Sequence, residues 1–80
     1  MQYVYLIEST GDAPQRYVGT TSDLRRRLAE HNAGKSPFTS QFKSWRLVTY
    51  IAFSDKRRAP EFERYLKSGS GHAFANRRLW

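Results

Sequence analysis

The sequence predicts an α+β fold in which helices flank a three-stranded, largely antiparallel sheet. Two short segments rich in β-branched and aromatic residues lie near the N-terminus with a turn between them, and a longer segment of the same kind follows residue 44. Two further stretches carry apolar pairs at helical spacing. A chain of 80 residues buries about enough apolar surface for one domain, so residues 1–80 are expected to form a single domain.

The first two strands are expected to form a hairpin. Residues 2–8 and 15–19 have strand composition, and residues 9–14 contain a glycine and a proline that are typical of a turn. If the turn is centred on its glycine, Tyr5 lies directly across from Tyr17, with about 5 Å between their Cβ atoms. A slip of one residue would place the two rings on opposite faces of the sheet.

The first helix is expected over residues 23–34. Thr21, Ser22 and Asp23 supply capping groups at its start, together with a carboxylate where the helix dipole is positive. Leu24 and Leu28 are four residues apart and are expected to face the core. Gly34 is suited to the position just past the last turn.

The second half of the chain predicts one strand and two helices. Residues 35–44 are polar and contain a proline, which indicates a loop. Residues 45–53 are apolar on both faces, so the strand is expected to be covered on both sides. A second helix is expected at about residues 59–67, with its proline in the first turn. After a glycine-rich break, residues 72–79 can form a last short helix.

The charge balance indicates a polyanionic partner. Fourteen Lys and Arg stand against seven Asp and Glu, which gives a net charge of +7 and a pI near 10.3. Nine of the fourteen basic residues lie in the second half of the chain. A basic excess of this kind favours nucleic acid, although it also serves solubility. The candidate contacts to nucleic acid from this half are Lys43, Arg46, Lys67 and Arg77.

The sequence excludes cysteine-based sites and shows no membrane or signal segment. Without cysteine, no disulfide and no thiolate metal site can form. No apolar run approaches the ~20 residues needed to cross a bilayer, and no signal peptide is visible. A protein of the cytoplasm without membrane contact is therefore expected.

An ordered set of polar residues resembles the GIY-YIG nuclease superfamily, in its small stand-alone bacterial form. The two family tripeptides correspond to Tyr-Val-Tyr at residues 3–5 and Tyr-Val-Gly at 17–19. A helix with arginine and histidine follows, and residues 61–71 resemble the helix that carries the metal-binding glutamate. The resemblance implies an endonuclease that uses one Mg²⁺ or Mn²⁺ ion to hydrolyse phosphodiester bonds in DNA. Branched, damaged or single-stranded DNA would be its substrate, in repair or recombination.

The resemblance also implies a catalytic site made of five residues. Glu63 would hold the ion, because Mg²⁺ keeps several waters and needs few protein ligands. Arg27 could grip the scissile phosphate in bidentate fashion. Tyr5 or Tyr17 would act as general base, and neighbouring positive charge would favour the phenolate. His31 could accept a proton or orient a tyrosine.

Several assignments remain open at this stage. Glu61 is a rival for the metal-binding role, since it lies in the same turn as Glu63. Asn76 is a further candidate contact, because some relatives use an asparagine near the end of the domain. Tyr3 replaces the first motif glycine, which puts substrate approach there in question. His72 is either structural or a phosphate contact.

Each site residue also has a simpler explanation. The two tyrosines could be ordinary cross-strand aromatics, and Glu63 could merely pair with Lys67 one turn away. A catalytically weak or inactive nucleic-acid-binding module is therefore the alternative function, and a protein-interaction domain is a third. The chain could act as a monomer, or as a homodimer that cuts both strands.

Overall fold

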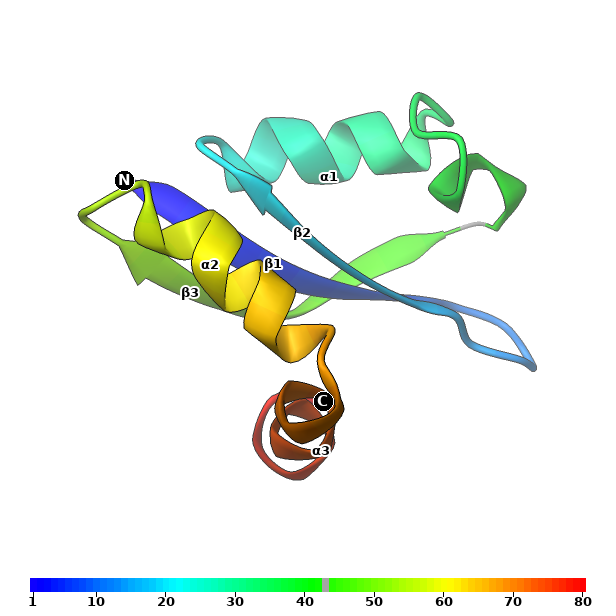
Figure 1. Cartoon of the computed structure of the whole chain (residues 1–80). Coiled ribbons are helices and arrows are strands. Elements are labelled where there is room, and N and C mark those ends of the chain that lie inside the picture. Colours follow the sequence, from blue (N-terminus) through cyan, green and yellow to red (C-terminus); the bar gives the residue numbers. More distant parts are fainter. Residues whose placement is uncertain (43) are drawn as a thin grey trace.

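The computed structural model describes residues 1–42 and 44–80 and has the predicted α+β architecture (Figure 1). The three strands form one sheet in the order β2-β1-β3, and both strand pairs are antiparallel. Three helices and a short 3₁₀ turn, η1, complete the fold. The elements in chain order are β1 (Gln2–Ser9), β2 (Arg16–Thr21), α1 (Leu24–Asn32), η1 (Thr39–Gln41), β3 (Trp45–Phe53), α2 (Arg58–Leu66) and α3 (Gly69–Arg78).

Helices cover both faces of the sheet, and the central strand β1 supplies the core of each (Figure 1). Val4 and Leu6 are fully buried against α2 and α3. Tyr5 and Ile7 point the other way and pack against α1. This alternation follows from the two-residue period of a strand.

The β1–β2 register differs from the predicted one by two residues. Tyr5 pairs with Gly19, and Tyr17 pairs with Ile7, so the hairpin is centred one residue later than the turn glycine. A shift by an even number keeps every side chain on its original face. The two tyrosines therefore still share one face as diagonal neighbours, although the prediction that they lie directly opposite is wrong.

Strand β3 is an edge strand, and the prediction that it is covered on both sides is wrong. Leu47 and Tyr50 are 36% and 52% exposed. The central position belongs to β1, which has paired strands on both sides and helices on both faces. Apolar composition alone could not distinguish the central strand from an edge strand.

The helix ends follow local capping chemistry. The Asp23 carboxylate accepts a hydrogen bond from the backbone N–H of Arg26, and Gly34 adopts φ = +78° just past α1. Helix α3 begins at Gly69, earlier than predicted, so the glycine-rich segment forms its first turn. A Cβ at Gly71 would collide with the backbone carbonyl of Tyr65, so glycine lets α3 start directly against the end of α2. Within the described residues, no helix combines the length and apolar character needed to cross a membrane.

Candidate active site

A buried hydrogen-bond network lies between α1 and the sheet. His31, in the last turn of α1, is completely buried. Its Nε2 lies 2.8 Å from the Tyr5 hydroxyl, and its Nδ1 lies 2.7 Å from the Thr39 hydroxyl. One helical turn earlier, the Nε–H of Arg27 donates to the same Tyr5 oxygen at 3.3 Å. Strand β1, helix α1 and η1 thus each contribute one part of the network.

The donors and acceptors of the network can be assigned in order. Because a guanidinium can only donate, the Tyr5 oxygen accepts from Arg27, and the Tyr5 hydrogen is left for Nε2 of His31. Neutral His31 then carries its own proton on Nδ1 and donates it to Thr39. Burial, followed by the charge of Arg27, lowers the pKa of His31, which favours this neutral form.

Arg27 retains donors for a further ligand. Its second contact is to Glu30, at 3.0 Å from NH1. A guanidinium has five N–H donors, and the contacts to Tyr5 and Glu30 use two of them. The Arg27 side chain is 30% exposed, so the remaining donors can reach an anion that approaches from solvent.

Tyr17 adds a second phenol beside this network. Its ring centroid lies 5.1 Å from that of His31 and 6.4 Å from that of Tyr5. Unlike Tyr5, which is 3% exposed, Tyr17 is only partly buried. The structure therefore brings Tyr5, Tyr17, Arg27 and His31 together, with Tyr17 the more accessible phenol.

The segment around η1 supplies two residues to this site, Phe38 against Tyr17 and Thr39 against His31. Residues 35–44 were predicted only as a polar loop. Phe38 stacks on Tyr17 with 6.1 Å between ring centroids and an interplanar angle of 21°. The carbonyl of Thr39 accepts a hydrogen bond from the Trp45 indole at 2.9 Å, which fixes the hydroxyl that contacts His31. Two phenylalanines in an otherwise polar stretch were the sequence signal for this packing.

Glu63 lies on α2, which packs against the face of the sheet opposite to the one that carries the two phenols. Burial is the main cause that raises the pKa of Tyr5, and the Glu63 carboxylate also raises it. The side chain of Glu63 is 24% exposed and pairs with Lys67 at 2.6 Å. Glu61 lies on a different side of α2, beside Phe53.

The two motif glycine positions differ in what they touch. A Cβ at Gly19 would lie 2.5 Å from the Tyr5 hydroxyl oxygen, so only glycine leaves room for that phenol. Tyr3, which stands where the family has its first glycine, packs edge-on against Tyr50 of β3, with 5.9 Å between centroids. Its ring is thus directed toward β3, away from the β2 edge where Tyr17 lies.

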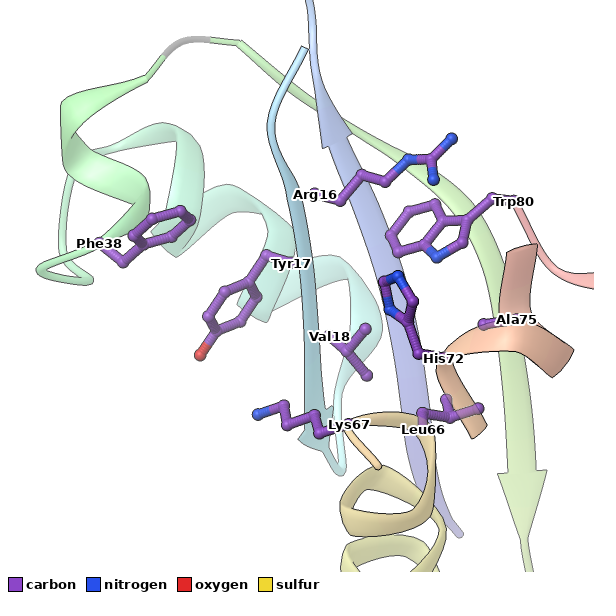
Figure 2. A pocket seen from close by; sticks show the side chains of 9 residues that line it. All are labelled: Arg16, Tyr17, Val18, Phe38, Leu66, Lys67, His72, Ala75 and Trp80. Carbon is purple, nitrogen blue, oxygen red and sulfur yellow. The ribbon is translucent and has the colours of Figure 1, made fainter. Parts of the chain in front are cut away.

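A groove with a cavity volume of about 450 Å³ crosses the edge strand β2 (Figure 2). Side chains of the α1 face and of the α2–α3 face both line it, so it joins the phenol side of the sheet to the side that carries α2. Its lining residues are Arg16, Tyr17, Val18, Phe38, Leu66, Lys67, His72, Ala75 and Trp80.

The predicted nucleic-acid contacts separate into two groups. Lys67 lines the groove, and so does His72, which the sequence left undecided. Lys43 lies outside the described residues, so its predicted role stays a prediction.

The other predicted contacts do not line the groove. Arg46 pairs with Glu8 at 2.7 Å on the surface of the sheet. Asn76 accepts a hydrogen bond from Arg16 at 3.2 Å, and Arg77 is exposed in the last turn of α3. Asn76 thus contacts a groove residue and neither of the two tyrosines.

The donor set suits an ion that is held mainly by water and substrate. Among the described residues, no group of three or more His, Asp or Glu side chains could enclose a metal. Glu63 offers a single, partly exposed carboxylate. Mg²⁺ commonly binds through one or two carboxylates, several waters and substrate phosphates, so one such oxygen donor fits it.

Comparison with known proteins identifies the family. Residues 1–76 match the GIY-YIG catalytic domain. The chain is 40% identical over 62 residues to a UPF0213 protein of Cupriavidus pinatubonensis, covering 76% of this chain and 67% of that protein. It is also 39% identical over 66 residues to a UPF0213 protein of Cupriavidus necator, covering 81% of this chain and 70% of that protein.

A further relative carries a functional name. The chain is 36% identical over 63 residues to a structure-specific endonuclease subunit SLX1 homolog of Giardia intestinalis, which covers 72% of this chain and 18% of that protein. No solved structure shows a significant match. With nearly its whole length matched, and with both tyrosine tripeptides on neighbouring strands of one sheet, the chain belongs to the GIY-YIG family of nuclease domains.

Proposed function

We propose that this single-domain chain is a divalent-metal-dependent endonuclease that hydrolyses phosphodiester bonds in DNA. The observation that carries the proposal is the meeting of Tyr5, Tyr17, Arg27 and His31 between α1 and the sheet. A set of ordinary cross-strand aromatics would not require a buried histidine and a shared arginine. The Giardia relative, named as a subunit of a structure-specific endonuclease, supports selection of the substrate by its structure. Branched, damaged or single-stranded DNA in repair or recombination is part of the proposal.

Tyr17 is the phenol that contacts the attacking water. It lines the groove, whereas Tyr5 is buried and already engaged by two partners. Acting as the phenolate, with its own proton first released to solvent, Tyr17 takes a proton from the water. The new oxygen–phosphorus bond forms as the bond from phosphorus to the leaving oxygen breaks, and this proton transfer contributes roughly 10²- to 10⁴-fold in rate. Tyr5 and His31 are positioning residues: they hold Arg27 and the edge of the Tyr17 ring in place.

Arg27 binds the scissile phosphate with the donors that Tyr5 and Glu30 leave unused. Its planar fork suits two phosphate oxygens at once. Glu63 is the residue that would hold one Mg²⁺ or Mn²⁺ ion. Such an ion supplies charge neutralisation at the phosphate and stabilises the leaving oxygen.

The test is nicking of plasmid DNA and of branched DNA with Mg²⁺ or Mn²⁺, with EDTA as the metal-free control. Glu63→Ala should abolish nicking, and Glu61→Ala on the same helix should leave it within about twofold. Circular dichroism of both variants checks that α2 is intact. If Glu63→Ala cuts as fast as the unchanged protein, the site assignment is wrong.

One observation favours a second candidate, a DNA-binding module with weak or no catalysis. The Glu63 carboxylate is already paired with Lys67, and this pair competes with metal binding. Salt-dependent DNA binding without nicking in any of several divalent metals would support this candidate over the nuclease.

A further inference from the structure

One stacked pair of side chains lies on each side of the groove that crosses β2 (Figure 2). On the α1 face, Phe38 stacks on Tyr17. On the α2–α3 face, the guanidinium of Arg16 lies over the Trp80 ring, with 4.7 Å from Cζ to the ring centroid. Both pairs consist of one inner ring and one flat outer group, and all four residues line the same groove.

The outer member of each pair is open to solvent. Phe38 is 42% exposed, and the side chain of Arg16 is 48% exposed. Phe38 also packs against Phe42 and Trp45, so part of its ring already serves to hold the η1 segment. The exposed remainder is not needed for that packing. A flat apolar ring and a flat guanidinium are the two groups on which nucleobases stack.

The charge of the groove suits the backbone of the same ligand. Arg16 and Lys67 line it. Each is paired, with Glu8 at 3.1 Å and with Glu63 at 2.6 Å, but their side chains are 48% and 56% exposed and carry further N–H donors. The chain as a whole carries +7. The cavity volume of about 450 Å³ falls within the roughly 300–1,000 Å³ that small-ligand pockets occupy. A duplex could present its phosphates to these cations but not the faces of its paired bases.

We propose that this groove binds unpaired nucleotides of single-stranded DNA, with bases stacked on Phe38 and Arg16 and the backbone crossing β2 beside Lys67. The inference rests on the proposed nuclease function, since it names the part of the substrate that the enzyme holds. It makes a single-stranded segment, such as a flap or gap, the preferred substrate over a continuous duplex.

Binding is measured in EDTA, so that cleavage plays no part. Fluorescence anisotropy compares a labelled ten-nucleotide oligothymidine with a duplex of equal length. Phe38→Leu keeps the apolar character but loses the flat ring, and Arg16→Lys keeps the charge but loses the plane. Each should raise the dissociation constant for the single strand about fivefold or more, with a smaller effect on the duplex.

Phe74→Leu is the matched control, because Phe74 is 39% exposed but does not line the groove. It should leave both dissociation constants unchanged. If Phe38→Leu binds single strands as tightly as the Phe74→Leu control, or weakens single strand and duplex equally, the stacking proposal is wrong.

A second measurement reports stacking directly and is independent of affinity. An oligonucleotide with 2-aminopurine at one position should lose fluorescence when saturated with protein, and Phe38→Leu should restore much of that fluorescence. Performing the measurement on Glu63→Ala separates the two proposals. If the oligonucleotide is quenched but the unchanged protein does not nick DNA, the nuclease proposal is wrong and the binding groove stands. If the unchanged protein nicks DNA but the oligonucleotide is not quenched, the stacking proposal is wrong and the nuclease stands.

Discussion

The face of the sheet under α2 and α3 and the face under α1 are built from alternate residues of the same strand. Val4 and Leu6 contribute aliphatic side chains to the first face, where they are buried together with Ala59, Leu66 and Ala75. Tyr5 contributes a phenol to the second, where His31 is equally buried but bonded at both ring nitrogens. The buried aliphatic layer of the first face serves stability, and the buried polar network of the second serves chemistry. Changes in these two layers should therefore have separable effects.

Tyr17→Phe should give the largest difference between the effect on nicking and the effect on stability. Removing the hydroxyl should reduce the nicking rate about 10²- to 10⁴-fold, since proton transfer from water is lost. The free energy of unfolding should change by less than about 1 kcal/mol, because the side chain is only partly buried. Single-turnover nicking and urea denaturation measure the two quantities. A rate within threefold of the unchanged protein would move the base role to another residue.

Leu6→Ala should show the reverse pattern. Truncating this fully buried side chain should cost about 2–5 kcal/mol of stability through lost burial and the cavity left behind. Nicking per folded molecule should remain at the original level at low temperature. Leu47→Ala, on the exposed part of β3, is the control and should cost about 0.5 kcal/mol or less. Equal destabilisation by both variants would contradict the placement of β1 at the centre.

Thr39→Val should lower both stability and the nicking rate, each by a moderate amount. The buried Nδ1–H of His31 would lose its acceptor, which costs about 1–3 kcal/mol. Nicking should slow by up to about 100-fold, because His31 no longer holds its orientation beside the tyrosines. Thr39→Ser restores the hydroxyl and should recover most of both losses. No difference between the valine and serine variants would show that the hydroxyl has no positioning role.

The smallest effect is expected from pH. Burial and then Arg27 lower the pKa of His31 in the folded state, so the unfolded chain, with a pKa of about 6.5, binds more protons just below that pH. Stability should therefore fall as the pH decreases below about 6.5. The carboxyl groups of Glu30 and Asp55, whose pKa values are also lowered, act only at more acidic pH.

Urea denaturation between about pH 7.5 and 5 isolates this contribution. His31→Gln should show a shallower decrease over the same range, although its stability at neutral pH is lower. If the two pH profiles run parallel, the neutral, buried state assigned to His31 is wrong.

Local patterns predicted most of the architecture. The β-branched and aromatic composition of the first strands, the leucine pair of α1 and the capping chemistry at its start each depend on neighbours in sequence. Each is found in the structure. The hairpin register and the edge position of β3 depend on which strands pair, which composition does not encode. These are the places where the predictions were wrong.

The sequence allowed the residues of the candidate site to be predicted, but not the contacts that they make. Family resemblance selected the tyrosines, Arg27 and His31, which the fold brings together. Thr39 was missed because its partner His31 is eight residues away and the intervening stretch has no periodic pattern. The expected contact of Arg46 with DNA stays a prediction. Its pairing with Glu8, which is 38 residues earlier in the chain, could not be predicted from local sequence.

The close contact between Gly19 and Tyr5 couples the two family tripeptides, residues 3–5 and 17–19. Since a Cβ there would lie 2.5 Å from the hydroxyl oxygen and 2.7 Å from Cζ of Tyr5, an alanine at 19 requires a side chain at position 5 that is shorter than phenylalanine. Substitutions at these two sites should accordingly covary, although fourteen residues separate them. Anyone who grafts this nuclease core onto another scaffold must transfer both tripeptides as one unit.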